Sequence, residues 1–264
     1  MTRFLDGSIL EDAMCTTIPL VYETDDYCII DKPKWVLSHP NSVRDMSTAS
    51  VVASLYHHYK KKLPSMWGFI RSGLVHRLDK ETDWLMIVAL SEHWLRYFRN
   101  IFQQKTEEYL QSSDHKSSSS LIKWYTAICS PRSVLSSFPA PPFVIDMIVY
   151  PNVSYTKPKR WITIIKNIIQ LSWFHVKVDI ELGTWRTHQI RYHLNKIGLP
   201  IVWDYLYDKN QKINQGKPEL QLKSSFLTFR DMNNNLISIV KSWSNIQLSI
   251  NNTKQYIYNN YNTT

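Results

Sequence analysis

The sequence has 264 residues, of which 44% are hydrophobic and 20% charged, so it suits one large domain or two small ones and excludes an intrinsically disordered chain. The formal net charge of +9 favours a polyanionic partner such as nucleic acid, although a basic surface without such a partner explains the charge equally well. Cys15, Cys28 and Cys129 are too far apart for a disulfide framework or a zinc knuckle. With no signal peptide and no apolar run near ~20 residues, we expect a cytoplasmic protein that enters no membrane.

The first part of the chain predicts three strands and two helices. In chain order we expect a strand, an acidic turn and a second strand over residues 21–31, a helix over 47–62, a buried strand over 85–90 and a helix that follows residue 91. Ser47 or Thr48 can cap the first helix, and Ser91 can cap the second. Residues 103–120 are polar, and their second half predicts a mobile loop.

The second part is dominated by strands. We predict strands over 123–129, 176–182, 225–229, 236–240 and 246–250, loops over 130–142 and 151–160, and a helix over 187–196. The tail after Asn251 shows no packing pattern. Strands outnumber helices and do not alternate strictly with them, which favours an α+β fold with a mixed, largely antiparallel sheet.

A carboxylate stands out in the segment GLVHRLDKETDWL, residues 73–85. Asp79 follows a short apolar stretch and is flanked by His76 and Arg77. Such an acid can be a nucleophile, a metal ligand or one half of a surface ion pair. Taken alone, the segment favours the ion pair, because structural networks also perturb acids.

A second polar cluster lies in the segment LGTWRTHQIRYHLNKIG, residues 182–198. It gathers Arg186, His188, Gln189, Arg191 and His193. The arginines offer a planar fork for carboxylate or phosphate. His188 and His193 are spaced poorly for two metal ligands on one helical face, so no metal site is predicted. A solvated basic helix is the alternative to a functional cluster.

Two further elements are weaker signals. Lys123 and Tyr125 flank Trp124 on a predicted strand, where a tyrosine is more often part of the core than catalytic. Lys32-Pro33 ends an earlier strand, and the loop that follows could present backbone and a surface on which a base stacks.

The order and wording of these segments resemble the RluA-type pseudouridine synthase family. The matching pieces are VYETDDYCIIDKPKWVLSHP, GLVHRLDKETDWLMIVAL, KWYTAI, ELGTWRTHQIRYHLNKIGLPIVWDYLY and LKSSFLTF, which cover most of residues 18–250. The motifs HRLD-x-x-T and RTHQIR-x-H are together highly specific.

The resemblance implies a fold and a reaction. The fold is an α+β pseudouridine synthase fold, with a mixed, mostly antiparallel sheet flanked by helices and a central basic cleft. We expect this catalytic domain over residues 18–250, after an extension at 1–17 without an S4-type RNA-binding domain and before a tail at 251–264. The reaction converts uridine to pseudouridine in ribosomal or transfer RNA, with no metal and no organic cofactor. We expect a monomer.

The resemblance also implies residue roles. Asp79 is the nucleophile, Tyr125 lines the uracil pocket and is a candidate base, and Arg191 pairs with the catalytic aspartate. Arg77 enters the RNA where the flipped base has left. Further RNA contacts are expected from Lys32, His76, Arg186, His188 and Gln189. Attack of the carboxylate at C1′ and attack at C6 both stay open.

The chain departs from the family at four glycines. Tryptophan stands there instead, at Trp35, Trp84, Trp185 and Trp203, in a chain with 6 Gly and 10 Trp; Asp83 also replaces a usual serine. One explanation is a catalytically inactive paralogue that still binds RNA. The other is a gene in which UGA codons specify glycine but have been translated as tryptophan. The native enzyme then has glycine at these four positions and is active. A metal-dependent hydrolase or nuclease using Asp79 and the histidines is a further alternative, revealed by sensitivity to a chelator.

Overall fold

The computed structural model has an α+β fold and describes most of the chain. The described residues are 10, 13–42, 45, 47–59, 63–65, 68–112, 114, 118–150, 157–209 and 219–257. Over these ranges the elements include three α-helices and eleven strands, and the strand pairs described below are antiparallel, which confirms the predicted fold class. The chain divides into two compact units, one formed by Met1–Phe102 with Leu227–Thr264 and the other by Gln103–Phe226.

The first unit contains a buried antiparallel ribbon. Strand β1 (Leu20–Glu23) pairs with β2 (Tyr27–Lys32), and β2 pairs with β3 (Asp83–Ala89). Every residue of β2 and β3 is buried, because apolar side chains project from both faces of these strands. Helix α1 (Val51–His58) follows β2, and the long helix α2 (Glu92–Gln111) begins in this unit.

Aromatic packing closes the core of the first unit. The ring of Tyr27 on β2 lies 4.7 Å from that of Trp94 and 5.3 Å from that of Phe98, both on α2. It also lies 5.8 Å from the ring of Phe229 on β8. The unit is completed by a run of strands, β8 (Leu222–Arg230), β9 (Leu236–Lys241), β10 (Ile246–Ile250) and β11 (Thr253–Ile257), of which β8 begins in the second unit.

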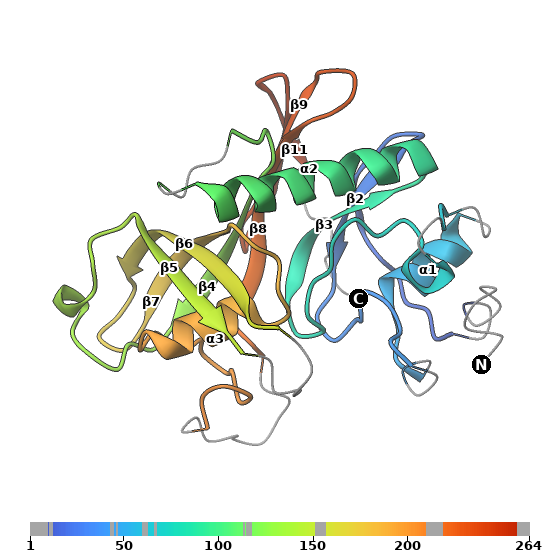
Figure 1. Cartoon of the computed structure of the whole chain (residues 1–264). Helices are drawn as coiled ribbons and strands as arrows, with labels where there is room; N and C mark the ends of the chain where they lie inside the picture. The colour runs from blue at the N-terminus through green and yellow to red at the C-terminus, as the bar shows by residue number, and fades with distance from the viewer. Residues whose placement is uncertain are drawn as a thin grey trace. The chain divides into compact units, whose positions relative to one another are not determined.

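The second unit is a sheet with one helix. Its strands are β4 (Ile122–Cys129), β5 (Phe143–Val149), β6 (Lys159–Gln170) and β7 (Val176–Leu182), in the order β5-β6-β7-β4. Helix α3 (Gln189–Lys196) lies against β6, as can be followed in Figure 1. The residues that follow β7 are therefore held close to the sheet.

Several elements differ from the sequence prediction. Helix α1 is shorter than 47–62, and its N-cap is Ser50, whose hydroxyl accepts the Ala53 N–H, rather than Ser47 or Thr48. Strand β5 was not predicted, and β6 starts inside the predicted loop at 151–160, of which residues 151–156 lie outside the described residues. The prediction of a tail without a packing pattern after Asn251 is wrong, because β11 pairs with β10.

Other elements are confirmed. The strand at 176–182 has the predicted bounds, and β10 spans the predicted 246–250. Within the described part of the chain, no helix is both long enough and apolar enough to cross a membrane. The domain boundaries at 18 and 250 stay a prediction.

Candidate active site

Asp79 lies in the loop between residue 74 and strand β3 of the first unit. Leu74 forms an isolated antiparallel bridge with Val88 on β3, and the loop returns to β3 at Asp83. The N–H of Thr82 donates to the carbonyl of Asp79 at 3.1 Å, which closes a turn beside the carboxylate. Asp79 is half-buried, so its side chain is partly accessible on a backbone tied to a buried strand.

The loop after β2 fixes this segment from the other side. The hydroxyl of Ser38 donates to the Leu78 carbonyl at 2.7 Å and accepts the Leu78 N–H at 3.0 Å, directly before Asp79. The Trp35 N–H donates to the Lys80 carbonyl at 2.9 Å, directly after it. Asp79 is therefore held between two backbone anchors, which limits the freedom of the loop.

Lys32 is a third anchor. Its side chain is fully buried, and its ammonium donates to the carbonyls of Pro33 at 2.9 Å and Lys80 at 3.2 Å. Burial lowers the pKa of Lys32 to about 7, against the attraction of Asp83 and Asp79, which raises it. The RNA contact that we expected from Lys32 stays a prediction; in the structure its buried side chain supports the loop of Asp79.

His76 and Arg77 differ in exposure. The Nε2 atom of His76 accepts the Ile87 N–H of β3 at 3.1 Å, and its ring lies 5.1 Å from that of Phe102. Both contacts hold the start of the loop. Arg77 is exposed, as the predicted insertion into RNA requires.

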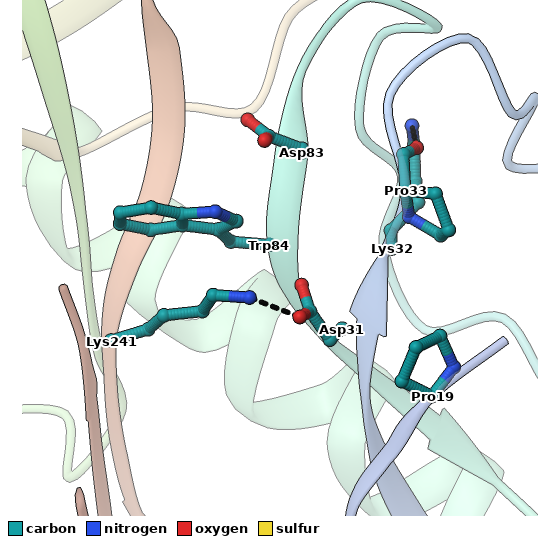
Figure 2. A pocket seen from close by; sticks show the side chains of 7 residues that line it. All are labelled: Pro19, Asp31, Lys32, Pro33, Asp83, Trp84 and Lys241. Atoms are coloured by element: carbon teal, nitrogen blue, oxygen red, sulfur yellow. Dashed lines mark hydrogen bonds and ion pairs between the residues drawn. The ribbon is translucent and has the colours of Figure 1, made fainter. Parts of the chain in front are cut away.

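A small cavity of about 250 Å³ lies beside these anchors in the first unit. Pro19, Asp31, Lys32, Pro33, Asp83, Trp84 and Lys241 line it. Figure 2 shows the ammonium of Lys241 paired with the carboxylate of Asp31 and the indole of Trp84 next to them. The Lys241 ammonium lies 5.2 Å from the centre of that indole, so the ring covers the ion pair. Asp83, the residue that replaces the family's serine, lines the same cavity.

The unusual tryptophans occupy unusual backbone. Trp35, Trp84 and Trp203 have φ angles of 65°, 83° and 65°. Glycine adopts this left-handed region without strain, whereas a residue with a Cβ atom does so at a cost. Trp185 does not share the feature, since its φ is not positive. Three of the four positions therefore have the backbone that a glycine would supply.

Tyr125 is held in the second unit on β4. Its side chain is buried, and its ring centre lies 5.2 Å from the ammonium of Lys123 on the same strand. Lys123 is itself fully buried and donates to the hydroxyl of Ser224 on β8. Burial lowers the pKa of Lys123 to about 7. The lysine of the K-x-Y element thus packs under the tyrosine as part of the core.

Gln189 organises the start of α3. Its amide nitrogen donates to the carbonyl of Ile162 at 2.8 Å and to the Thr163 hydroxyl at 2.9 Å. Its amide oxygen accepts from the Thr184 hydroxyl at 2.7 Å and from the N–H of the half-buried Arg186 at 3.2 Å. Gln189 is almost wholly buried and joins β6 to α3, and the RNA contact that we expected from it stays a prediction.

The two histidines of the segment have separate environments. His188 is the left-handed N-cap of α3, with a φ of 58°, and its Nδ1 atom lies 3.3 Å from the Tyr207 hydroxyl. His193 is buried with Nδ1 2.9 Å from the Thr163 hydroxyl, and burial lowers its pKa to about 4. His193 is thus neutral at pH 7.

Arg191 is buried in a paired state. Its Nε and Nη2 atoms donate to the two carboxylate oxygens of Asp204 at 2.9 and 2.7 Å, and the ring centre of Tyr207 lies 5.5 Å from its Cζ atom. Sequence reasoning did not single out Asp204 or Tyr207, although both lie in the matched segment IVWDYLY. Ser38, which lies in the matched segment VYETDDYCIIDKPKWVLSHP, and Lys241, which lies outside the matched segments, were not singled out either.

The predicted catalytic residues belong to different units. Asp79 lies in the first unit, while Tyr125 and Arg191 lie in the second, where the Val202 N–H after α3 donates to the Ile128 carbonyl of β4. No cluster of three or more His, Cys, Asp or Glu side chains suited to a metal ion occurs among the described residues. The functional groups of the predicted catalytic residues are the carboxylate of Asp79, the phenol of Tyr125 and the guanidinium of Arg191.

Comparisons with known proteins point to one family. The family model described as RNA pseudouridylate synthase matches residues 26–196, more than half of the chain. Ribosomal large subunit pseudouridine synthase D of Yersinia pestis is 30% identical over 207 residues, which are 77% of this chain and 58% of the relative. The protein of the same name from Salmonella typhimurium is 30% identical over 81% of this chain and 60% of its own length. The chain thus spans less than two thirds of these relatives.

Solved structures share the fold. Human RNA pseudouridylate synthase domain containing 1 has a TM-score of 0.57 and 15% identity, covering 86% of this chain and 83% of that one. Human RNA pseudouridylate synthase domain containing 4 has a TM-score of 0.57 and 18% identity, covering 85% and 88%.

Proposed function

Because the chain belongs to the RNA pseudouridylate synthase family, we propose that it isomerises uridine to pseudouridine in RNA without a metal or an organic cofactor. The family match over residues 26–196 supports this most directly, since it includes Asp79, Tyr125 and Arg191. We propose ribosomal RNA of the large subunit as the substrate, because the curated relatives are named for it. Transfer RNA is the alternative substrate. We also propose that the enzyme is a monomer and acts in the cytoplasm.

The proposed reaction is an isomerisation with no net loss or gain of atoms. The N-glycosidic bond between N1 and C1′ of uridine breaks, the uracil turns, C5 bonds to C1′, the C5 proton is removed, and N1 takes up a proton. The Asp79 carboxylate holds the sugar or the base covalently between the two halves, as carboxylates do in retaining glycosidases. Tyr125 lines the uracil pocket and is the candidate base for the C5 proton.

The proposed electrostatics rest on Arg191. A guanidinium beside a carboxylate favours its ionised form, so Arg191 keeps Asp79 charged and oriented. The family pattern of the segment that contains Arg191 supports this pairing.

The proposed RNA contacts follow from exposure. The target base must leave the stack before the carboxylate can reach it, and a side chain fills the gap. Arg77 is exposed and takes this place. The half-buried Arg186, His188 and His76 contact the RNA, and Lys32 and Gln189 support the loops that do so.

The experiment compares the chain with its Asp79→Asn variant. Both are incubated with large-subunit ribosomal RNA transcribed without modifications, and pseudouridine is measured by nuclease digestion and mass spectrometry. We expect product from the parent chain and none from the variant, with similar RNA affinity for both. Turnover of Asp79→Asn within about tenfold of the parent would reject the nucleophile, since tenfold is only about 1.4 kcal/mol of barrier.

The competing function is an inactive RNA-binding paralogue, in which Trp84 replaces a glycine of the family on β3, the strand that follows the loop of Asp79. It predicts RNA binding without pseudouridine in the parent chain. A Trp84→Gly variant that gains activity would then assign the block to the indole.

A further inference from the structure

One turn holds Arg191 from two sides. Asp204 binds it through two parallel hydrogen bonds, and the Tyr207 ring lies over its Cζ atom. The side chains of both charged partners are 1% exposed. A buried arginine without a partner would be costly, and a two-point contact with a carboxylate also fixes the plane of the guanidinium.

The turn itself is rigid. The N–H of Asp204 donates to the Ile201 carbonyl at 3.1 Å, and the N–H of Asp208 donates to the Asp204 carbonyl at 2.8 Å. The N–H of Tyr207 donates to the carboxylate of Asp204 at 3.3 Å. The hydrogen bonds of the turn therefore fix the position of the Asp204 carboxylate independently of its contact with Arg191.

The turn is also attached to the strand of Tyr125. Ile201 forms an antiparallel bridge with Cys129 at the end of β4, and the Val202 N–H donates to the Ile128 carbonyl at 2.8 Å. Strand β4 thus places the turn, and the turn places Arg191. Two residues with proposed catalytic roles share one support within the second unit.

The binding mode of Asp204 determines what Arg191 can do. Asp204 accepts from Nε and Nη2 of Arg191, and this two-point contact fixes the plane in which the other N–H groups of the guanidinium lie. The charge of Asp204 also offsets the positive charge of Arg191. The orientation of the guanidinium N–H groups therefore matters more for its interaction with a second carboxylate than its net charge does.

We propose that Asp204 is a positioning residue for the reaction: it orients Arg191 so that the guanidinium addresses the Asp79 carboxylate, and Tyr207 supports the same orientation. The proposal rests on the proposed function, since it presupposes that Arg191 acts on Asp79. Neither Asp204 nor Tyr207 needs to touch the RNA.

The test uses single-turnover rates at saturating enzyme with the ribosomal RNA transcript. Asp204→Asn keeps the shape of the side chain and removes its charge. We expect the rate to fall by about 10–100-fold, by analogy with the loss that follows when a residue that orients a metal ligand is replaced. The RNA affinity should change by less than about threefold, because binding does not use this pair.

Asp208→Asn is the matched control. Asp208 is a buried acid of the same turn and pairs with Arg132 at 3.1 Å. Its replacement should leave the rate within about threefold of the parent. Equal losses of rate in Asp204→Asn and Asp208→Asn would overturn the proposal, because they would indicate general damage to the turn.

A second pair of variants covers the case in which Asp204→Asn does not fold. Tyr207→Phe keeps the ring over Arg191 and should keep the rate, whereas Tyr207→Leu removes the aromatic ring and should lower it with unchanged RNA affinity. Equal rates for both would overturn the role of Tyr207. Failure of the proposed function is distinct: the parent chain would then make no pseudouridine. If Arg191→Met is inactive while Asp204→Asn is as fast as the parent, only the positioning role is rejected.

Discussion

The left-handed backbone at three tryptophans makes a quantitative prediction. At each of Trp35, Trp84 and Trp203 we compare a Gly variant with an Ala variant, so that both lose the indole and only the backbone preference differs. An L-residue in left-handed backbone costs about 1–2 kcal/mol. Glycine loses roughly 0.5–1 kcal/mol relative to alanine through its freer unfolded chain. The difference of the two ranges is about 0–1.5 kcal/mol, so the Gly variant should be more stable than the Ala variant by about 0.8 kcal/mol on average over the three positions.

At position 185 the expected difference in stability between the Gly and Ala variants has the opposite sign. Its φ is not positive, so only the entropy of the unfolded chain distinguishes the two replacements, and Trp185→Ala should be the more stable by roughly 0.5–1 kcal/mol. The measurement is the free energy of unfolding in urea, with equal m-values as the check that the unfolded states are comparable. Ala variants as stable as the Gly variants at 35, 84 and 203 would refute the reasoning.

The same backbone predicts glycine in the native protein. Peptides isolated from the source organism should show by mass a glycine at positions 35, 84 and 203, and the gene should have UGA codons there. UGG codons at these positions and at 185 would exclude this explanation and favour the inactive paralogue.

Three further predictions follow from the site. Arg191→Met should reduce turnover strongly with little change in RNA affinity; a separation of more than about 6 Å between the guanidinium and the Asp79 carboxylate in an RNA complex would transfer the role to Arg186. The logarithm of RNA affinity should fall linearly with the logarithm of salt concentration, by roughly 0.7–0.9 per neutralised phosphate, and a flat response would argue against an RNA substrate. The folded-state pKa of Lys123, about 7, lies below its unfolded value, so the unfolded chain binds more protons above pH 7. The unfolding free energy should therefore rise from pH 7 to 10 relative to Lys123→Met, by at most about 1.4 kcal/mol per pH unit, and parallel curves would contradict the shift.

The fold was predictable where the pattern of side chains is simple. Residues 176–182 alternate between apolar and polar side chains, and the strand has the predicted bounds. Strand β6 escaped prediction because its paired isoleucines interrupt the alternation. Helix α1 begins late because Ser50, not an earlier hydroxyl, caps it.

The site was predictable as a set of motifs but not as a set of contacts. The segments around Asp79 and Arg191 are recognisable in sequence, whereas Ser38 and Asp204 act through contacts with residues 40 and 13 positions away. The burial of Lys32 is equally invisible, since a lysine at a strand end is usually solvated. Tertiary packing decides whether a charged side chain meets the substrate or the backbone.

The interruption of the first unit in sequence sets the order in which it can be completed. The ribosome makes Met1–Phe102, then all of the second unit, and only then the end of β8 with Phe229, which packs on Tyr27 and Phe98. The segment Met1–Phe102 therefore cannot complete its unit until Leu227–Thr264 has been synthesised, by which time the whole of the second unit has been made. A chain that ends at Phe226 should keep the strands of the second unit but lose Phe229, which packs against Tyr27 of β2 in the core of the first unit. Splitting this protein into two expressible halves therefore requires joining Phe102 to Leu227 with a linker.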